Sequence, residues 1–427
     1  MMSIEQLYTI YTKYPDVQTD SRNIKSGELY FALTGENFNG NFFAMEALDK
    51  GAPFVIIDDP SFKISDRCIL VNDTLQCLQS LARYHREQFK IPFIAVTGSN
   101  GKTTTKELIT SVLSTTYKTY ATIGNLNNHI GVPLTILKIR KDAEMAIIEM
   151  GANHQKEIES YCAIASPTHA LITNCGKAHL EGFGGLEGVR KAKGELYDFI
   201  REVKGTIFRN VDLDYLESMA AGIDKQITYG SGNAQYTGMP IMNGPYSGAA
   251  ILSASNECTI QTQLVGEYNF SNIMAAFAIG REMNVPVNSI KAAMEVYAPD
   301  NSRSQLISEG SNTLILDAYN ANPTSMAAAI LNFAKSDYLN KVVIIGAMKE
   351  LGIESIEEHQ KIISLLKQHN WNEVVLVGGD FEKVRHDYIY FNDSVRAHDW
   401  FQSNPFKNTA FLIKGSRAFQ MEKVIGK

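Results

Sequence analysis

The chain lacks the features of a secreted, membrane-spanning or nucleic-acid-binding protein. Its five cysteines are scattered and form no C-x-x-C pair, which argues against a disulfide framework or a zinc site. No stretch approaches the roughly 18 apolar residues of a membrane span. The opening MMSIEQLYTIYTKYPD has no basic segment followed by an apolar run. Basic residues number 40 against 46 acidic ones, so the surplus of a general nucleic-acid binder is missing. We expect a cytoplasmic protein with reduced thiols.

Length and patterning predict an α/β protein of three domains. The 427 residues are 44% hydrophobic and 20% charged, which suits a soluble globular protein too long for one core. Buried-strand runs alternate with helical stretches, a pattern typical of mostly parallel sheets covered on both faces. We predict a small α/β domain over 1–87, a central domain with a mostly parallel sheet over 88–300, and a Rossmann-like α/β domain over 301–427. In the last, the runs TLILDAY, KVVIIGAM, EVVLVGG and TAFLIKG should each precede a helix.

The clearest local motif is a glycine-rich turn between the strand run IPFIAVTG and a helical stretch. Its residues are Gly98, Ser99, Asn100, Gly101, Lys102, Thr103 and Thr104. Such a loop turns backbone N–H groups toward phosphates, while Lys102 can reach the β- and γ-phosphates and the Thr103 hydroxyl can ligate Mg²⁺. The general pattern has glycine where this chain has Val96, so the motif is a shortened variant, and a chance turn is the alternative. The central domain is expected to be of the P-loop ATPase type.

Two further positions carry groups that could hold a metal ion. Glu149 ends the strand run AEMAIIEM, and a carboxylate at the carboxyl end of a parallel strand faces the ligand crevice. It is therefore a candidate Mg²⁺ ligand beside Thr103, with a surface cap as the alternative. His179 and Glu181 follow the strand run THALITN in a loop. From the residues alone, a lone loop histidine such as His179 is more often a simple hydrogen-bonding residue than a metal ligand.

Lys193 lies on the apolar stripe of a predicted helix. In LEGVRKAKGELYDFI the stripe runs through Val189, Leu196 and Ile200, and Lys193 falls four residues after the first and three before the second. The neighbouring Lys191 instead aligns with Glu195 and Asp198, which predicts a polar face. A lysine on the inner stripe either extends to solvent, pairs with a carboxylate, or is a desolvated amine with a lowered pKa. Spacing leaves these three alternatives open.

Taken together, the motifs resemble those of the Mur ligase family. The phosphate loop TGSNGKTTTK looks like that family's shortened version, and TDSRNIKSGELYFALTGENFNGN is similar to its uridine-nucleotide segment. Further similar blocks cover nearly the whole chain in the expected order: ATIGNLNNHIGVPLTIL, IIEMGANHQKEI, AHLEGFGGLEGVRKAKGELY, GEYNFSNIMAAFA, LDAYNANPTSM, MKELG and IKGSRAFQME. The resemblance implies an ATP-dependent, ADP-forming ligase that makes an amide bond.

The resemblance also implies roles for individual residues. The phosphate loop would bind ATP, with Asn272 at the adenine and Arg303, Asp317, Tyr319 and Asn320 closing over the nucleotide. Two Mg²⁺ sites are implied, one on Thr103 and Glu149 and one on His179 and a carbamylated Lys193. The implied catalytic residues are Lys102, Lys193, His179 and Asn128. The implied contacts to the uridine-linked substrate are Ser21, Arg22, Asn37, Phe38, Asn127 and Asn128, and those to a dipeptide are Asn322, Lys414, Ser416 and Arg417.

The blocks are most similar to those of family members that join D-alanyl-D-alanine to UDP-N-acetylmuramoyl-tripeptide in peptidoglycan precursor synthesis. The resemblance implies that the first domain binds the uridine-linked substrate, that the central domain binds ATP, and that the third closes over ATP and binds the dipeptide. It implies an acyl-phosphate intermediate and a third domain that swings. We expect a cytoplasmic monomer with no nucleic-acid partner and no membrane span.

The sequence departs from the family pattern at a few positions, and rival functions predict features that differ from those of this chain. Tyr268 stands where the family commonly has histidine, Ala347 replaces a frequent aspartate, and Asn39 and Asn41 replace an aspartate and a histidine. A sister ligase that adds the third amino acid would carry an Asp-Asn-Pro-Arg block, which is absent. A nucleotide-dependent switch would explain the phosphate loop but not an inward Lys193 or the two outer domains.

Overall fold

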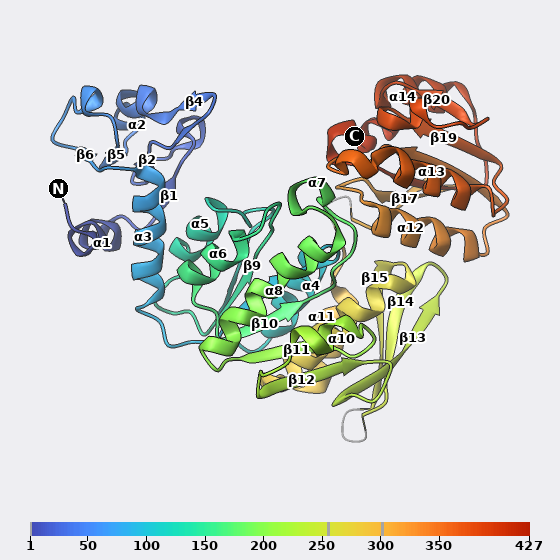
Figure 1. Ribbon diagram of the computed structural model, residues 1–427, viewed down its shortest axis with the longest axis horizontal. Helices are drawn as coiled ribbons and strands as arrows, with labels where there is room; N and C mark the ends of the chain where they lie inside the picture. Colours follow the sequence, from blue (N-terminus) through green and yellow to red (C-terminus); the bar gives the residue numbers. More distant parts are fainter. Residues whose placement is uncertain (1, 254–256, 300–302) are drawn as a thin grey trace.

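The computed structural model describes residues 2–253, 257–299 and 303–427, which fold into three α/β units that follow one another along the chain (Figure 1). Each unit is built on its own sheet, and parallel pairing dominates all three. The α/β class and three-domain organisation expected from the patterning are therefore found. Among the described residues, no helix combines the length and apolar character needed to cross a bilayer.

The N-terminal unit has a four-stranded parallel sheet in the order β1-β2-β5-β6 and a short hairpin, β3–β4. Helix α3 packs against α1 of this unit and against α5 and α6 of the central unit, so it forms the connection between the two (Figure 1). The elements are α1 (Ile4–Lys13), β1 (Val17–Gln18), β2 (Leu29–Phe31), β3 (Thr34–Gly35), β4 (Phe38–Asn39), α2 (Ala44–Asp49), β5 (Val55–Ile57), β6 (Cys68–Leu70) and α3 (Thr74–Arg86).

The central unit has a nine-stranded sheet in the order β15-β14-β13-β12-β11-β10-β7-β9-β8, in which only the β13–β14 and β14–β15 pairs are antiparallel. Its strands are β7 (Phe93–Thr97), β8 (Thr119–Ala121), β9 (Met145–Glu149), β10 (His169–Ile172), β11 (Thr206–Asn210), β12 (Lys225–Gly230), β13 (Tyr236–Asn243), β14 (Tyr246–Ile251) and β15 (Cys258–Val265). Its helices are α4 (Lys102–Leu113), α5 (Gly131–Leu137), α6 (Glu157–Ala165), α7 (Leu180–Phe183), α8 (Leu186–Glu202), α9 (Tyr215–Met219), α10 (Phe270–Glu282) and α11 (Val287–Val296).

Helices cover both faces of this sheet, which explains the continuous apolar runs of its strands. In β7, Ile94 and Val96 belong to the core shared with α4, α10 and α11, whereas Phe93 and Ala95 belong to the core shared with α5, α6 and α8. Every residue of β7 and β9 is buried, as expected for parallel strands between two helical layers. The carboxyl ends of these strands carry the phosphate loop and Glu149.

The C-terminal unit has a six-stranded sheet in the order β16-β17-β21-β18-β19-β20, parallel except for the β16–β17 pair. Its elements are β16 (Gln305–Glu309), β17 (Asn312–Asp317), α12 (Pro323–Lys335), β18 (Asn340–Gly346), α13 (Ser355–Leu366), β19 (Glu373–Val377), β20 (Ile389–Phe391), α14 (Ser394–Ser403) and β21 (Thr409–Lys414). The helices predicted directly after EVVLVGG and TAFLIKG are wrong. Short 3₁₀ turns follow these two strands instead, and after β19 Gly378 and Gly379 both take positive φ, which an α-helix does not accommodate.

Candidate active site

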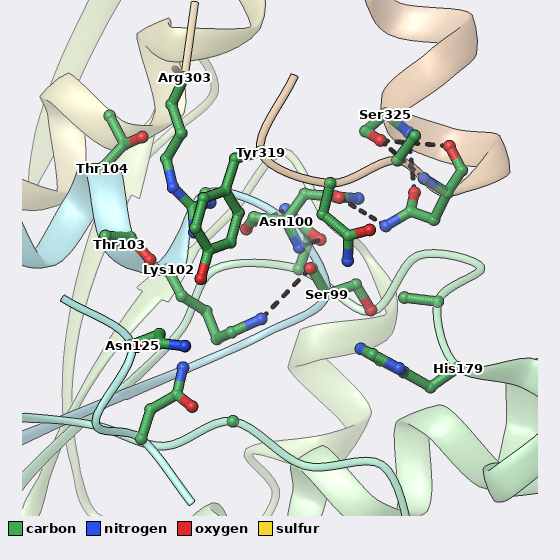
Figure 2. A pocket seen from close by; sticks show the side chains of 18 of the residues that line it. Ser99, Asn100, Lys102, Thr103, Thr104, Asn125, His179, Arg303, Tyr319 and Ser325 are labelled. Atoms are coloured by element: carbon green, nitrogen blue, oxygen red, sulfur yellow. Dashed lines mark hydrogen bonds between the residues drawn. The ribbon is translucent and has the colours of Figure 1, made fainter. Parts of the chain in front are cut away.

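A cleft of about 560 Å³ lies between the central and C-terminal units, and its walls hold most of the residues singled out from the sequence. Those that line it are Ser99, Asn100, Gly101, Lys102, Thr103, Thr104, Asn127, Asn128, Glu149, His179, Asn272, Arg303, Asp317, Tyr319, Asn320, Asn322 and Lys414. Figure 2 shows Arg303 and Tyr319 toward the Thr104 side of this cleft and His179 toward the opposite side. The fold thus brings together side chains that are more than 300 positions apart in the sequence.

The phosphate loop is held in a shape that requires its glycines. Gly98 has φ +146°, and a Cβ atom there would lie 2.0 Å from Thr173 Oγ1. The Thr173 hydroxyl donates to the Asn100 carbonyl at 2.6 Å, and the Asn100 N–H donates to Asn174 Oδ1 at 3.0 Å. Because α4 begins at Lys102, the loop leads directly into a helix N-terminus, which favours an anion. The backbone therefore has the geometry of a phosphate-binding site.

Lys102 folds back over this loop. Its Nζ atom donates to the carbonyl oxygen of Gly98 at 2.6 Å and to that of Ser99 at 3.3 Å, and the bond to Ser99 is drawn in Figure 2. Burial lowers the pKa of Lys102 to about 8, with a further lowering by Arg303 and an opposing effect of Glu149. An anionic phosphate in the loop would favour the charged ammonium and reverse this shift.

Glu149 lies at the end of β9 and is only 1% exposed. Its Oε1 atom accepts hydrogen bonds from Thr103 Oγ1 at 3.1 Å and from Asn127 Nδ2 at 2.7 Å. Its Oε2 atom is buried and has no hydrogen-bond partner among the described residues. A buried carboxylate oxygen without a partner is costly unless an ion or another donor engages it, so this pair of oxygens fits a hard cation such as Mg²⁺.

His179 makes a contact between the two units. Its Nδ1 atom lies against the carboxylate of Glu350, which belongs to the loop after β18, and this interaction lowers the pKa of Glu350. The His179 backbone is left-handed, with φ +53°, where it precedes α7. Within the described residues, no three His, Cys, Asp or Glu side chains cluster as a metal site. An ion in the cleft would therefore need further ligands from substrate and water.

Lys193 is buried, as its helical spacing predicts. Its side chain is 1% exposed and shares α8 with the fully buried Val189, Leu196 and Ile200. Its Nζ atom lies 3.5 Å from the carbonyl oxygen of Ala152, a residue of the cleft wall. No carboxylate of the described residues pairs with it, so neither the solvent-reaching nor the salt-bridged alternative holds. Burial, followed by the charge of Lys102, lowers the pKa of Lys193 to about 7.

One prediction about the same helix is wrong. Glu195 was expected on a polar face with Lys191, but it is buried. Its carboxylate accepts hydrogen bonds from the backbone N–H groups of Lys156 at 2.6 Å and Glu159 at 3.1 Å. These are donors at the start of α6, which packs against α8, so Glu195 caps a neighbouring helix.

Side chains in the C-terminal wall of the cleft contact one another and the phosphate loop. The Arg303 guanidinium lies over the Tyr319 ring at 3.6 Å from its centroid. Lys414 Nζ pairs with Asp317 Oδ2 at 2.6 Å. Asn322 caps α12 and donates from Nδ2 to Asn100 Oδ1 at 2.8 Å. This last bond joins the C-terminal unit directly to the phosphate loop.

Comparison with known proteins identifies the family. Residues 13–86 match the model of the Mur ligase family, catalytic domain, 96–280 that of the Mur ligase middle domain, and 302–416 that of the Mur ligase, glutamate ligase domain. The chain is also 32% identical over 423 residues to the UDP-N-acetylmuramoyl-tripeptide–D-alanyl-D-alanine ligase of Haemophilus influenzae, covering 96% of this chain and 92% of that protein. The chain belongs to the Mur ligase family.

Solved structures show the same architecture as this Mur ligase. A crystal structure of MurF from Acinetobacter baumannii superposes with a TM-score of 0.88 at 30% identity, covering 99% of this chain and 97% of that one. The MurF ligase of Thermotoga maritima in complex with ADP gives 0.87 at 25% identity and covers 100% and 97% of the two chains. These matches confirm the three-domain α/β fold.

Some predicted site residues lie outside the cleft of this Mur ligase. Ser416 is buried, and Arg417 pairs with Glu422 at 2.6 Å. Ser21, Arg22, Asn37 and Phe38 belong to the N-terminal unit, where Arg22 pairs with Asp20 and Phe38 stacks on Phe43. Their contacts with a uridine-linked substrate stay a prediction.

Several cleft residues of this Mur ligase were not singled out from the sequence as site residues. Tyr268 is mentioned above only as a departure from the family pattern. Its hydroxyl forms a hydrogen bond of 2.8 Å with Ser304 Oγ, which joins the central and C-terminal units. Lys349 and Glu350 also line the cleft. Both lie in the block MKELG, so the block signalled the loop without indicating what these two side chains do.

Proposed function

We propose that this Mur ligase joins D-alanyl-D-alanine to UDP-N-acetylmuramoyl-tripeptide at the expense of ATP, as a step in peptidoglycan precursor synthesis. The observation that carries the proposal is the cleft, in which a phosphate loop and the Glu149 carboxylate face a second α/β unit. The relatives that match over nearly the whole chain carry this activity in their names.

The nucleotide would lie along the phosphate loop. Lys102 and the start of α4 would hold its phosphates, and Arg303 and Tyr319 would cover it from the C-terminal unit. The solved relative with ADP supports use of the nucleotide. Asn272, which accepts from Thr105 Oγ1 at 3.0 Å beneath the loop, lies on the side where the base would bind.

Glu149 and Thr103 would hold a first Mg²⁺, since Glu149 Oε2 is buried without a partner in the described chain. His179, through Nε2, and a carbamylated Lys193 would hold a second. Bound Mg²⁺ would offset the repulsion between anionic reactants and stabilise the charge on the transferring phosphoryl group.

The Lys193 amine suits carbamylation, because burial leaves a large neutral fraction of the amine near pH 7. The neutral amine would react with CO₂ to give an anionic carbamate and a proton.

The reaction would proceed in two steps. A carboxylate oxygen of the tripeptide bonds to the γ-phosphorus as the bond to ADP breaks, which gives an acyl phosphate. The neutral amine of the dipeptide then attacks the acyl carbon, a proton leaves to solvent, and phosphate departs. Lys102 would offset charge during the first step, and Asn127 and Asn128 would face the substrates at the cleft wall.

The C-terminal unit would close over the bound nucleotide and exclude water from the acyl phosphate. Contacts that would hold the closed state include Asn322 to Asn100 at 2.8 Å and Lys177 to Glu358 at 2.6 Å. The N-terminal unit would bind the uridine-linked end of the tripeptide substrate. We further propose that the protein acts as a cytoplasmic monomer.

The test is ADP release by the purified protein with Mg²⁺ and ATP in an omission series. We expect release only when both UDP-N-acetylmuramoyl-tripeptide and D-alanyl-D-alanine are present. ADP release without either substrate would favour a nucleotide-dependent switch. Release with a single amino acid in place of the dipeptide would favour a sister ligase. Either result would overturn the proposal.

A further inference from the structure

The loop of residues 348–351, which follows β18, contacts the central unit beside His179. The Glu350 carboxylate lies against His179 Nδ1, and the Glu350 carbonyl accepts a hydrogen bond from the N–H of Glu181, in α7, at 3.3 Å. Glu350 makes these contacts with a left-handed backbone, φ +64°, which is uncommon for a residue other than glycine. A loop that keeps such a conformation is held in it by its surroundings.

Part of this support comes from His359, a histidine of α13. Its Nε2 atom lies 3.0 Å from the backbone nitrogen of Met348, and its Nδ1 atom lies 2.7 Å from the carbonyl oxygen of Ser355, one helical turn earlier. The Phe381 ring packs edge-on against the imidazole, with 4.6 Å between the ring centroids. His359 is 0% exposed, so water does not compete for either ring nitrogen.

These two contacts determine the protonation state of His359. A backbone N–H can only donate, so Nε2 accepts from Met348 through a free lone pair. A carbonyl oxygen can only accept, so Nδ1 carries the proton and donates it to Ser355. The ring is therefore neutral, with its proton on Nδ1. A second proton on Nε2 would set two N–H groups against each other and break the bond to the loop.

The charged groups around His359 lie on its own helix and on two loops. Asp380, after β19, accepts from Ser355 Oγ at 2.6 Å, Glu358 precedes His359 on α13, and Lys349 belongs to the loop itself. Burial lowers the pKa of His359 below its usual range. The hydrogen bond to Ser355 and the carboxylates of Asp380 and Glu358 oppose this effect, and the charge of Lys349 adds to it. The net direction favours the neutral ring that the two contacts require.

We propose that the neutral imidazole of His359 positions the loop of residues 348–351 against His179, and so assembles that side of the cleft for the reaction. The inference rests on the proposed function and adds a positioning residue to it. His359 is not among the described residues that line the cleft, so it acts through the loop. Figure 2 shows His179 on the side of the cleft opposite to Arg303 and Tyr319. Loss of the bond to Met348 should therefore affect kcat more than KM for ATP.

The first test replaces the hydrogen-bond acceptor. His359→Leu fills the space but leaves the buried Met348 N–H without a partner, so kcat should fall roughly tenfold with little change in KM for ATP. His359→Gln keeps an acceptor near the position of Nε2 and should recover much of this loss. The matched control is His398→Leu, because His398 contacts the Val424 carbonyl in the same unit and does not line the cleft. It should leave kcat unchanged. A His359→Leu variant that keeps the native kcat would overturn the inference.

The second test uses the native protein, so it does not depend on how well a variant folds. Imidazole ¹⁵N NMR should show the neutral ring of His359 with its proton on Nδ1 near pH 7. The resonances are assigned by their loss in His359→Gln. A proton on Nε2, in either the neutral or the charged ring, would overturn the inference.

A double variant with Glu350→Gln shows whether His359 acts through the loop. Because both changes affect the same contact with His179, His359→Leu should lower kcat less in the Glu350→Gln protein than in the native one. Additive losses would show that His359 stabilises the fold without positioning the loop, and would overturn the inference. A native protein that makes no pentapeptide fails the proposed function. That result is distinct from failure of the inference alone, in which the native protein is active and His359→Leu is equally active.

Discussion

Thr103 and Glu149 lie 46 residues apart in the sequence, yet the Thr103 hydroxyl donates to Glu149 Oε1 at 3.1 Å. The pairing arises because β7 and β9 are neighbours in the sheet and their carboxyl ends meet at one edge. The second carboxylate oxygen, Oε2, is buried without a partner in the described chain. Together these groups form the candidate Mg²⁺ site.

Glu149→Gln tests that site. The amide keeps the shape of the side chain but removes the negative charge, so we expect at least a tenfold rise in the Mg²⁺ concentration needed for half-maximal activity. The measurement is a Mg²⁺ titration at saturating ATP. Glu217→Gln, on the exposed surface, is the control and should leave the titration unchanged. An unaltered Mg²⁺ requirement in Glu149→Gln would remove Glu149 from the site.

Lys193→Ala tests the carbamate. We expect the variant to lose most activity and to regain part of it with added short carboxylates, which can occupy the space of the carbamate. If Lys193→Ala is as active as the native protein with no carboxylate added, the carbamate is contradicted. A merely structural lysine would give a loss that carboxylates do not relieve.

The pH and CO₂ dependence gives a second test of Lys193. Because burial lowers its pKa to about 7, the neutral amine predominates above that pH and is lost as the pH falls below it. Carbamylation requires the neutral amine, so activity should depend more strongly on added bicarbonate at pH 6 than at pH 8. The measurement is the initial rate in CO₂-depleted buffer with and without bicarbonate. Equal bicarbonate dependence at both pH values would count against this account.

The pair formed by Lys177 and Glu358 tests closure of the C-terminal unit. Glu358 is almost fully buried and accepts from Lys177 of the central unit at 2.6 Å and from Lys361 of its own helix at 2.8 Å. Lys177→Met should weaken the closed state by about 1 kcal/mol and raise KM for ATP roughly fivefold. Lys361→Met is the matched control, because Lys361 contacts the same carboxylate but lies in the same unit as Glu358. Solution scattering with an ATP analogue should show less compaction for Lys177→Met alone.

The hydrogen bond between Tyr268 and Ser304 allows a test of how the C-terminal unit is positioned. Ser304 has φ +51°, a backbone conformation uncommon for serine, and it is held by the Tyr268 hydroxyl at 2.8 Å and by a bond from its N–H to Asp317 Oδ1 at 3.2 Å. Tyr268→Phe removes one hydroxyl and should raise KM for ATP about 3- to 10-fold, with little change in kcat. Ser304→Ala should have the same effect, and the double variant should add nothing further. Additive losses would show that the two hydroxyls act independently.

The sequence predicted those parts of the site that depend on local pattern. The strand and helix patterns placed the phosphate loop between β7 and α4, and helical spacing alone placed Lys193 inward. Position at the end of a strand run was enough to bring Glu149 beside Thr103. These predictions succeeded because the periods of strands and helices fix which side chains face the core.

Contacts between units could not be predicted in this way. Lys177 and Glu358 are 181 positions apart and meet only because the C-terminal unit docks against the loop after β10. The contact of Glu350 with His179 has the same origin. Glu195 was misassigned because its partners are backbone groups of another helix, α6, which no period within α8 reveals.

In the proposed reaction, this cleft transfers a phosphoryl group to the tripeptide carboxylate before the amide forms. The most direct measurement uses UDP-N-acetylmuramoyl-tripeptide labelled with ¹⁸O in both oxygens of the reacting carboxylate, followed by mass spectrometry of the products. If an acyl phosphate forms, the UDP-linked pentapeptide keeps one ¹⁸O and the inorganic phosphate carries the other. Phosphate without ¹⁸O, or ADP formed with no pentapeptide, would contradict the proposed reaction.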